Sequence, residues 1–524
     1  MRFFNTAGPI KADLHYQVPP LGRIDLGNLL RLIREQKYFV LCAPRQTGKT
    51  SALLALRDEL NESGEYRCVY VNVEVGQSAR EDVEAAMRAI LGSIALEADD
   101  DALEEIWLRA LRTGSPHHAL QKTLARWAQL EPKPIVLMID EIDALIGDTL
   151  LAVLRQLRAG YANRPDRFPQ SVILCGVRDV RDYRIRSTSE EAIVLGGSAF
   201  NISAKSLRLG DFSAQEAESL LTQHTEATGQ AFNEEARREI WALTQGQPWL
   251  VNALAYEACF ENGDGRDRSR AISREAIQEA REQLILERVT HLDQLTDKLR
   301  EERVRRVIEP LLTGTDIGDS ISDDDIQYVR DLGLVAAKDP IAIANPIYRE
   351  VIPRDLTYPT QAMTIHQEAA WYLNAKGELV MGKLLEAFQA FFREHSEHWV
   401  ERFQYKEAGP QLLLQAFLQR IVNGGGRIER EYGLGHRRTD LLIIWPVTSS
   451  DTIQRAVIEC KILHHSMERT EREGLGQTRA YMDRCAATEG HLVIFDRSPD
   501  KSWAEKVFCR QVTDGGEPVT IWGT

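Results

Sequence analysis

The sequence predicts a multidomain α/β protein, and three observations lead to this class. Short apolar runs alternate with helical patterns along residues 38–176, which is typical of a parallel sheet covered by helices on both faces. A loop that contains glycine and lysine, residues 43–50, separates the first apolar run from a helix. A second set of apolar runs begins near residue 401, after a mainly helical stretch. The length of 524 residues also exceeds what one hydrophobic core supports.

The elements of the first region follow from apolar periodicity. A helix is expected at 26–34, where apolar residues recur at helical spacing after a segment rich in proline and glycine. Strands are expected at 38–42, 67–73, 134–139 and 171–176, and helices at 49–60, within 80–130 and at 148–158. These positions give a sheet whose strands all run in one direction.

Helical patterns dominate the middle of the chain. Residues 205–350 are mostly helical, and Ser213 with Glu216 forms a capping box before an apolar run. A boundary is expected near 355–360, where Pro353 and Pro359 frame a polar stretch. Residues 361–400 are expected to be helical, and the pattern then changes to helix, strand, strand, strand, helix and strand.

Charge and cysteine content limit the classes of function. The net charge of −14 argues against a general electrostatic attachment to nucleic acid or acidic membranes. Residues 401–524 hold 17 basic and 17 acidic side chains, so any contact with nucleic acid is expected there. The seven cysteines form no Cys-x-x-Cys pair and favour reduced, buried thiols. No apolar run is long enough to span a membrane, which favours a cytoplasmic protein with no membrane partner.

The loop after the first strand has the residues of a phosphate-binding loop. It consists of Ala43, Pro44, Arg45, Gln46, Thr47, Gly48, Lys49 and Thr50, and Ser51 follows in the helix. Such a loop points backbone N–H groups at an anion, Lys49 can reach the β- and γ-phosphates, and the Thr50 hydroxyl can bind Mg²⁺. Ala43 stands where this pattern usually has glycine, which is a mild departure.

Two later strand ends complete a candidate nucleotide site. The strand 134–139 ends at Asp140 and Glu141, which are suited to hold Mg²⁺ and to polarise the attacking water. The strand 171–176 is followed by Arg178, which either reaches the γ-phosphate or forms a surface salt bridge. Nearby Arg184 and Arg186 leave open a contribution to a neighbouring subunit. Because no guanine-reading Asn/Thr-Lys-x-Asp sequence occurs, ATP is the expected nucleotide.

A second group of chemically active residues lies near the C-terminus. Asp440 precedes one apolar strand, and Glu459 and Lys461 alternate along the next and so share one face. If the two strands form a hairpin, Asp440 meets Glu459, and two facing carboxylates favour a bound Mg²⁺ or Mn²⁺. Lys461 can orient water or neutralise a phosphate. The alternative for Glu459 and Lys461 is a solvent-facing ion pair.

The helix after these strands adds Gln477 and Tyr481, one turn apart on one face. Glu407 is a further acidic candidate, or else a helix-capping residue. His464 and His465 lie near Lys461 and are better explained as residues of a solvated loop.

The motifs of the first region resemble the AAA+ and STAND group of P-loop ATPases, close to the archaeal-type ATPases of the origin-recognition branch. The resemblance covers about residues 20–355 and includes the Gly246-Gln247-Pro248 turn. It implies that Pro248 lies beside the adenine and that 301–352 is similar to a winged helix. The acidic start of the candidate recognition helix 322–331 favours a packing module that senses nucleotide state over a DNA-binding one.

The C-terminal motifs resemble the PD-(D/E)XK nuclease superfamily, in the branch with a Gln-x-x-x-Tyr helix. The resemblance covers about 401–497, although Thr439 replaces the proline of the superfamily's name. It implies that Asp440 and Glu459 are metal ligands, that Lys461 is the catalytic lysine, and that Gln477 and Tyr481 support the scissile phosphate.

Together the motifs predict five parts. These are a P-loop ATPase domain at 1–204, a helical lid at 205–285, a winged-helix domain at 286–357, a helical linker at 358–400 and a nuclease-like domain at 401–524. The expected function is an ATPase that gates a Mg²⁺-dependent nuclease acting on nucleic acid, DNA above all, with defence against foreign DNA as an architectural analogy. One alternative is a STAND-type signalling switch that assembles as a homo-oligomer on ATP binding and whose C-terminal domain only binds nucleic acid or a partner. The other is an origin-recognition-like DNA loader.

Overall fold

The computed structural model of the chain describes residues 2–179, 182, 184–187, 192–195, 199–286, 298–299, 301–313, 321–356, 371–402, 414, 417–418, 426–430, 441–447, 452–463, 466–496, 498, 501–513 and 517–524. They fall into two compact units. The first consists of Met1–His291, Gln327–Pro340 and Ala344–Ile347, and the second of Leu292–Ile326, Ile341–Ile343 and Tyr348–Thr524.

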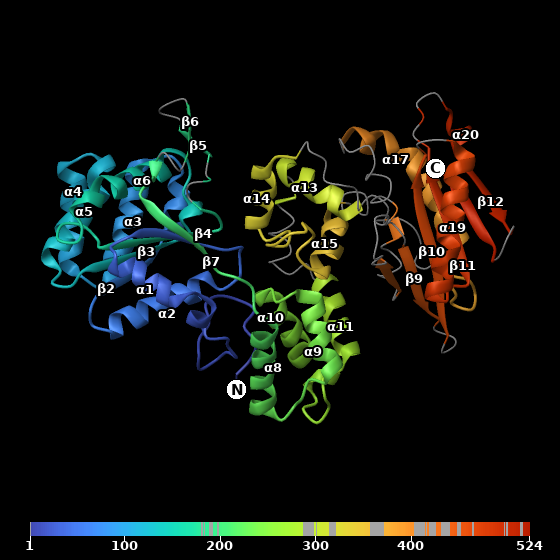
Figure 1. The fold of residues 1–524 in the computed structure, drawn as a ribbon, viewed down its shortest axis with the longest axis horizontal. Coiled ribbons are helices and arrows are strands. Elements are labelled where there is room, and N and C mark those ends of the chain that lie inside the picture. The colour runs from blue at the N-terminus through green and yellow to red at the C-terminus, as the bar shows by residue number, and fades with distance from the viewer. Residues whose placement is uncertain are drawn as a thin grey trace. The chain divides into compact units, whose positions relative to one another are not determined.

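The first unit is built on a parallel sheet of five strands (Figure 1). Its strands are β1 (Tyr38–Cys42), β2 (Arg67–Asn72), β3 (Ile135–Asp140), β4 (Ser171–Gly176) and β7 (Ser203–Arg208), in the order β2-β3-β4-β1-β7. The four strands expected from the sequence are confirmed. The fifth, β7, pairs in parallel with β1 and runs across residue 204, where the sequence interpretation ended the domain.

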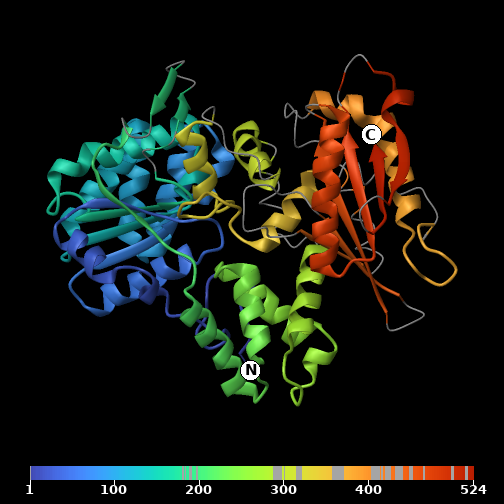
Figure 2. The ribbon, with the colours of Figure 1, turned by 45° about the vertical axis from the view of Figure 1, so that its right-hand side comes forward.

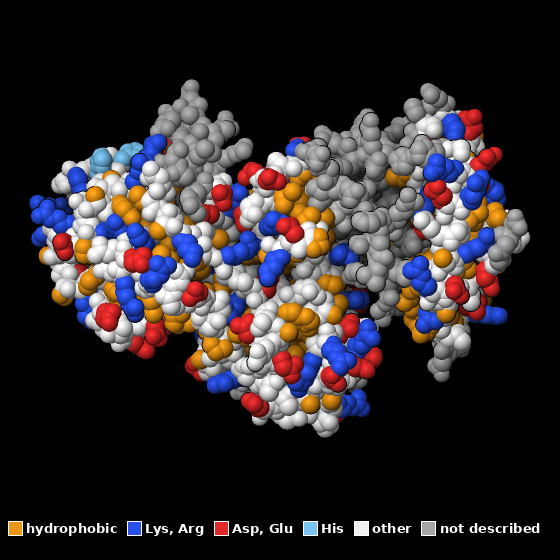
Figure 3. Space-filling view, in the orientation of Figure 1, with side chains coloured by type: hydrophobic (Ala, Val, Ile, Leu, Met, Phe, Trp, Pro, Cys, Tyr) orange, Lys and Arg blue, Asp and Glu red, His pale blue; other side chains and the backbone are white. Residues whose placement is uncertain are grey.

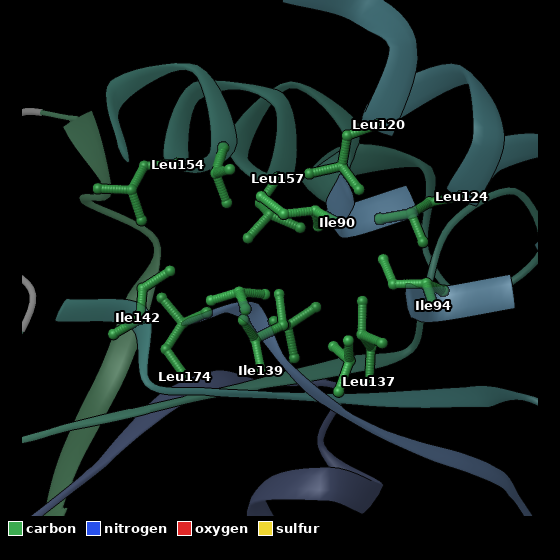
Figure 4. Packing of buried hydrophobic residues seen from close by; sticks show 14 of the residues in the cluster. Ile90, Ile94, Leu120, Leu124, Leu137, Ile139, Ile142, Leu154, Leu157 and Leu174 are labelled. Carbon is green, nitrogen blue, oxygen red and sulfur yellow. The ribbon is translucent and has the colours of Figure 1, made fainter. Parts of the chain in front are cut away.

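Helices cover both faces of this sheet. Helices α1 (Leu26–Arg34) and α2 (Lys49–Glu62) pack on one face, and α3 (Val83–Ala98), α5 (Pro116–Leu130) and α6 (Gly147–Gly160) pack on the other, with α4 (Asp101–Thr113) against α5. Figure 4 shows the second layer, where Leu137, Ile139 and Leu174 of the sheet face aliphatic side chains of the helices. The short elements of this region are η1 (Pro20–Arg23), η2 (Val73–Ala79), η3 (Ile142–Ala144), η4 (Tyr161–Asn163) and the antiparallel pair β5 (Arg184–Ser187) and β6 (Ala192–Leu195).

A helical lid follows the sheet in the same unit. It comprises α8 (Ala214–Thr228), α9 (Glu234–Thr244), α10 (Pro248–Tyr256), η6 (Glu257–Glu261), η7 (Asp264–Arg266) and α11 (Arg274–Leu286). The capping box of Ser213 and Glu216 at the start of α8 is confirmed. The N-terminal segment packs on these helices, because the Trp249 indole N–H donates to the Thr6 carbonyl and the Asn5 N–H donates to the Asn252 side chain.

Three helices lie in the region expected to resemble a winged helix: α13 (Glu302–Thr313), α14 (Asp323–Asp331) and α15 (Pro346–Leu356). The expected helix at 322–331 is therefore present, with three aspartates in its first turn. Arg303 of α13 contacts the carboxylates of Asp324 and Asp325 at 2.8 and 3.0 Å. This arginine offsets part of the negative charge at the start of α14.

The second unit contains a mixed sheet of six strands. They are β8 (Arg427–Arg430), β9 (Leu441–Pro446), β10 (Ile453–Ile462), β11 (Glu489–Phe495), β12 (Phe508–Val512) and β13 (Val519–Gly523), in the order β12-β13-β11-β10-β9-β8. Helix α19 (Met467–Cys485) packs on one face and α17 (Met381–Arg402) on the other (Figure 2), and α20 (Trp503–Lys506) is short. Strands β8, β9 and β10, helix α19 and strand β11 follow one another in the expected order, whereas the helix expected between residue 401 and these strands lies almost wholly outside the described residues.

One expectation for this unit is wrong. The helix expected over 361–400 is absent at 371–380, where the chain forms a tight turn, and helix α17 begins at Met381; residues 361–370 lie outside the described residues. In that turn the Asn374 N–H donates to the Glu378 carbonyl, and Leu373 bridges to Leu379. Asn374 and Gly377 favour this turn over a helix, since Gly377 has a φ of 76°. Among the described residues no helix is long and apolar enough to cross a membrane.

Two glycines on the helical layer of the first unit should respond oppositely to alanine. A Cβ at Gly160 would lie 2.2 Å from the ring of the buried Phe168, whereas a Cβ at Gly92 in α3 meets its nearest neighbour at 3.9 Å. We expect Gly160→Ala to lower the free energy of unfolding by about 1–3 kcal/mol through overpacking. Gly92→Ala should raise it by about 0.5–1 kcal/mol, because alanine is the better helix former.

Both effects are measured by denaturation of the full chain. The unfolding transition to follow is the one that moves when nucleotide is added, because it reports the first unit. Equal changes in the free energy of unfolding, in the same direction for Gly160→Ala and Gly92→Ala, would contradict this description of the packing.

Candidate functional site

The phosphate-binding loop has the geometry that its sequence predicts. It connects β1 to α2, and Gly48 adopts a φ of 92° immediately before the helix. Only glycine enters that region without strain, which accounts for Gly48 at this position. The Thr47 hydroxyl donates to the Pro44 carbonyl at 2.8 Å. The loop therefore ends on a helix N-terminus, where free N–H groups favour an anion.

Lys49 turns back onto its own loop. Its ammonium donates to the carbonyls of Ala43 and Pro44, both at 3.1 Å, and the side chain is buried. A bound phosphate would have to replace these two carbonyls as the hydrogen-bond acceptors of Lys49.

Asp140, at the end of β3, is the most enclosed acid of the site. The Thr50 hydroxyl and the Tyr70 phenol donate to its Oδ2 at 2.8 and 3.0 Å, and the Glu141 N–H donates to its Oδ1 at 2.9 Å. The structure thus brings Thr50 and Asp140 together, as the sequence predicted. A hydroxyl and a carboxylate at this distance are the oxygen ligands that Mg²⁺ prefers, so these two residues fit the ion.

Glu141 lies directly beyond the strand in a left-handed conformation, with a φ of 55°. Burial raises the pKa of its carboxyl, as do Asp143 and Asp140, whereas Lys49 lowers it. A raised pKa is the direction expected of a carboxylate that accepts a proton from water. The unusual backbone turns this side chain away from the path of the strand.

Arg178, which follows β4, is engaged by a carboxylate. Its guanidinium Nε lies 3.3 Å from Oδ2 of Asp331 at the end of α14, and its Cζ lies 4.8 Å from the centre of the Tyr328 ring. Arg208, at the end of β7, contacts the other oxygen of Asp331 at 3.0 Å. Arg178 and Asp331 are only 6% and 5% exposed. The surface salt bridge considered for Arg178 is therefore replaced by a buried ion cluster.

The turn after α14 also touches the phosphate-binding loop. A Cβ at Gly333, whose φ is 78°, would lie 2.7 Å from Cβ of Pro44. The segment 327–333 therefore packs on two parts of the candidate nucleotide site, the loop after β1 and the arginine after β4.

The lid contributes the Gly246-Gln247-Pro248 turn. Gly246 has a φ of 82°, and its carbonyl accepts from the Phe212 N–H at 2.8 Å. Pro248 is the first residue of α10 and is buried, and the Gln247 side chain caps the helix by accepting from the Leu250 N–H. Contact of Pro248 with adenine stays a prediction.

Arg23 links the loop to the start of the lid. Its guanidinium donates to the carbonyls of Thr47 and Gly210, and it lies 4.8 Å from the centre of the Phe212 ring. Burial lowers the pKa of Arg23 to about 10, so the side chain stays charged at neutral pH. This arginine fixes the position of the loop relative to residues 210–212.

A second candidate site lies on β10 of the other unit. Glu459 is 2% exposed and pairs through Oε1 with the Lys461 ammonium, while its Oε2 has no hydrogen-bond partner within the described residues. Burial raises the pKa of Glu459, and Lys461 lowers it. A buried carboxylate oxygen without a donor is costly, and a cation would satisfy it. Glu459 therefore fits a metal ion.

Glu459 and Lys461 point to the face of the sheet that α19 covers. Along β10, Ile458 and Cys460 belong to the core cluster on the α17 side, whereas Val457 belongs to the cluster on the α19 side. Since side chains alternate, Glu459 and Lys461 share the side of Val457.

Gln477 and Tyr481 lie on α19 itself. Tyr481 is buried in the cluster on this side, and the Oε1 of Gln477 is buried without a partner among the residues described. Tyr481 thus lies on the side of the sheet to which Glu459 and Lys461 point, and Gln477 precedes it by one helical turn.

Several predicted residues fall outside the description. Asp440, Glu407, His464 and His465 lie beyond the described residues, as does Thr439. The hairpin of β9 and β10 is confirmed, and its register pairs Leu441 with Ile458. No cluster of three or more His, Cys, Asp or Glu side chains is placed to hold a metal in the part of the chain that the structure describes.

The sequence interpretation missed four residues of the first site: Arg23, Tyr70, Arg208 and Asp331. Arg23 and Arg208 carried no motif that links them to the loop. Tyr70 reaches Asp140 only because β2 and β3 are neighbours in the sheet. For Asp331 the available signal in the sequence was an acidic residue at the end of an expected helix. Sequence alone cannot show that this residue pairs with Arg178.

Comparison with known proteins finds a family match for one part of the first unit. Residues 33–183 match the family described as AAA domain. The chain therefore carries a P-loop ATPase domain of the AAA type, with a five-stranded parallel sheet and a phosphate-binding loop. A search of curated proteins gives no match.

The chain also shows similarity to solved structures, three of which follow. The Walker-type ATPase PABY2304 of Pyrococcus abyssi is 14% identical, with 67% of this chain and 99% of that chain covered and a TM-score of 0.43. The RuvB Holliday junction branch migration motor of Thermotoga maritima is 12% identical, with 63% and 95% covered and a TM-score of 0.34. Cdc6p from Pyrobaculum aerophilum is 16% identical, with 63% and 91% covered and a TM-score of 0.34.

The first test of the site is Glu141→Gln. We expect ATP hydrolysis to fall by about 10²–10⁴-fold, because the amide cannot accept a proton from water. Nucleotide affinity should stay within about twofold, as no phosphate contact is removed. Phosphate release and binding of a fluorescent ATP analogue measure the two effects.

Asp143→Asn is the matched control, since it neutralises an acid two residues away in the same turn. A full hydrolysis rate in Glu141→Gln would remove Glu141 from the catalytic site.

Proposed function

We propose that the chain is an ATP-controlled, metal-dependent nuclease. The AAA-type domain would bind and hydrolyse ATP, and the second unit would cleave phosphodiester bonds at Glu459 and Lys461. The observation that carries this proposal is the buried Glu459, which has one oxygen on a lysine and the other without a donor among the described residues. A structural ion pair has no need for an unsatisfied buried oxygen, whereas a metal ligand does.

The chemistry follows from these groups. A divalent cation held by Glu459, and by Asp440 as the sequence predicts, would polarise a phosphoryl oxygen and lower the pKa of a bound water. Lys461 would orient the water or neutralise the charge that develops on the phosphate. Gln477 and Tyr481 would hydrogen-bond the phosphate from α19.

The hairpin register supports Asp440 as a partner of Glu459. Leu441 pairs with Ile458, and Asp440 and Glu459 are the next residues on the two strands in the direction in which the pairing would continue. The order of three strands, helix and strand from β8 to β11 supports the predicted nuclease-like domain.

On the ATPase side, Lys49 and Thr50 would hold the triphosphate and Mg²⁺, with Asp140 as a further ligand of the ion and Glu141 preparing the water. Ala43 to Ser51 would wrap the phosphates, and Pro248 would contact adenine. Arg178 would then exchange Asp331 for the γ-phosphate, because both partners offer negative oxygens to the same buried guanidinium. Release of Asp331 would free α14 and so report nucleotide state.

Two alternatives use the same ATP site. The Arg178–Asp331 cluster favours a signalling switch that assembles on ATP binding, because such a switch needs no second enzymatic activity. A DNA-loading ATPase would need a basic surface, whereas Figure 3 shows Lys and Arg interspersed with Asp and Glu on the described surface of this face. DNA is proposed here as the substrate of the second unit.

The nuclease proposal is tested by cleavage of single- and double-stranded DNA and RNA with Mg²⁺ or Mn²⁺, with and without ATP. We expect Glu459→Gln and Lys461→Ala to reduce cleavage by at least about 100-fold, because each removes a group that acts on the scissile phosphate. ATP hydrolysis should be unchanged in both variants.

Asp496→Asn is the matched control, because Asp496 is a buried acid in the same unit that pairs with Lys501 and has a structural role. An equal loss of cleavage in Glu459→Gln, Lys461→Ala and Asp496→Asn would show that Glu459 and Lys461 are structural residues. Absence of cleavage by the wild type would favour the signalling switch.

Asp331→Asn tests the nucleotide sensor. We expect ATP to bind about fivefold or more tightly relative to ADP, because a competitor for Arg178 loses its charge. Calorimetric titration with both nucleotides measures the ratio.

Asp339→Asn is its control, since Asp339 forms an exposed ion pair with Arg330 near the same turn. An unchanged ATP-to-ADP ratio in Asp331→Asn would show that Asp331 does not compete with the γ-phosphate.

A further inference from the structure

Tyr70 occupies a place in the ATP site that no sequence motif assigns. It lies on β2, next to β3 in the sheet, and is paired in register with Met138, two residues before Asp140. The side chains of Tyr70, Met138 and Asp140 therefore point to one face, the face that α2 covers. Tyr70 is 9% exposed and Asp140 is fully buried.

The hydrogen bonds around Asp140 are divided between its two oxygens. Oδ1 accepts from the N–H of Glu141 at 2.9 Å. Oδ2 accepts from both the Thr50 hydroxyl at 2.8 Å and the Tyr70 phenol at 3.0 Å. The Tyr70 phenol is the donor in its bond to Oδ2, because a carboxylate oxygen accepts.

These donors differ in their relation to Mg²⁺. Thr50 would use an oxygen lone pair for the ion, and its single hydrogen could still be donated to Oδ2. Tyr70 approaches from β2 and would act only as a donor to Asp140. An aspartate carboxylate rotates readily about its last torsion, so a fixed donor decides which oxygen faces the ion.

We propose that Tyr70 is a positioning residue of the magnesium site: together with the Glu141 N–H, its phenol would hold the Asp140 carboxylate in one orientation when Asp140 and Thr50 bind the ion. The proposal rests on the ATP site described above and is independent of the nuclease proposal. It goes beyond the predicted site, which assigns Mg²⁺ to Thr50 and Asp140 alone.

Tyr70→Phe keeps the ring and removes the donor. We expect the Mg²⁺ concentration that half-saturates binding of a fluorescent ATP analogue to rise by about tenfold, as is usual when the partner of a metal ligand is lost. Nucleotide affinity without Mg²⁺ should stay within about twofold, and hydrolysis should recover to within about threefold at saturating Mg²⁺. Direct titration of Mn²⁺ by electron paramagnetic resonance gives a readout that is independent of hydrolysis.

Tyr38→Phe is the matched control. Tyr38 is another buried tyrosine of the same sheet, and its phenol donates to the Pro169 carbonyl at 2.9 Å. Its loss should cost stability without moving the Mg²⁺ midpoint. An unmoved midpoint in Tyr70→Phe, or an equal shift in Tyr38→Phe, would overturn the proposal.

A second measurement covers the case in which Tyr70→Phe fails to fold. With 3-fluorotyrosine placed at position 70 of the full chain, the fluorine resonance should shift when Mg²⁺ is added to the nucleotide-bound protein, and the same label at position 38 should not respond. A silent label at position 70 would overturn the proposal. Failure of the wild type to bind ATP with Mg²⁺ would instead overturn the ATP site itself.

Discussion

The common direction of the five strands in the first unit is the constraint on which the ATP site depends. Because β1, β3, β4 and β7 are parallel, their carboxyl ends meet at one edge of the sheet. The loop at 43–50, Asp140, Arg178 and Arg208 follow or end these four strands, although they are up to 165 residues apart in the chain. An antiparallel neighbour would have sent one of these side chains to the opposite edge. Apolar layers on both faces hold the strands in this arrangement.

Buried charge is handled differently in the two units. In the first, Asp331 receives two arginines and a hydrogen bond from Gln327, so the desolvated carboxylate is well compensated. In the second, Glu459 has a lysine on one oxygen and no donor on the other within the described residues. The first arrangement suits a contact that holds until a stronger anion replaces it. The second suits a site that needs a cation.

Hydrogen bonds from elements far apart in sequence shape the ATP site as much as its motifs do. Arg23, from η1, holds the loop through the Thr47 carbonyl, and Tyr70, from β2, holds Asp140. Each donates a hydrogen bond that orients its acceptor. The acceptor is a loop carbonyl for Arg23 and a side-chain carboxylate for Tyr70. The turn after α14 adds a close contact at Pro44. Nucleotide binding would therefore act on several segments at once.

The sequence by itself determined the parallel α/β class, four of the five strands, the loop with Lys49 and Thr50, the acids Asp140 and Glu141, the capping box at Ser213, and the hairpin that carries Glu459. These features depend on local patterns, namely apolar runs, a glycine at positive φ and alternation along strands. Only the tertiary structure decided the fifth strand β7 and the partners Asp331 for Arg178 and Tyr70 for Asp140. These depend on which strands become neighbours and on which distant helix packs against them, and burial selects those pairings across the whole chain because a lone buried charge is too costly to leave unpaired.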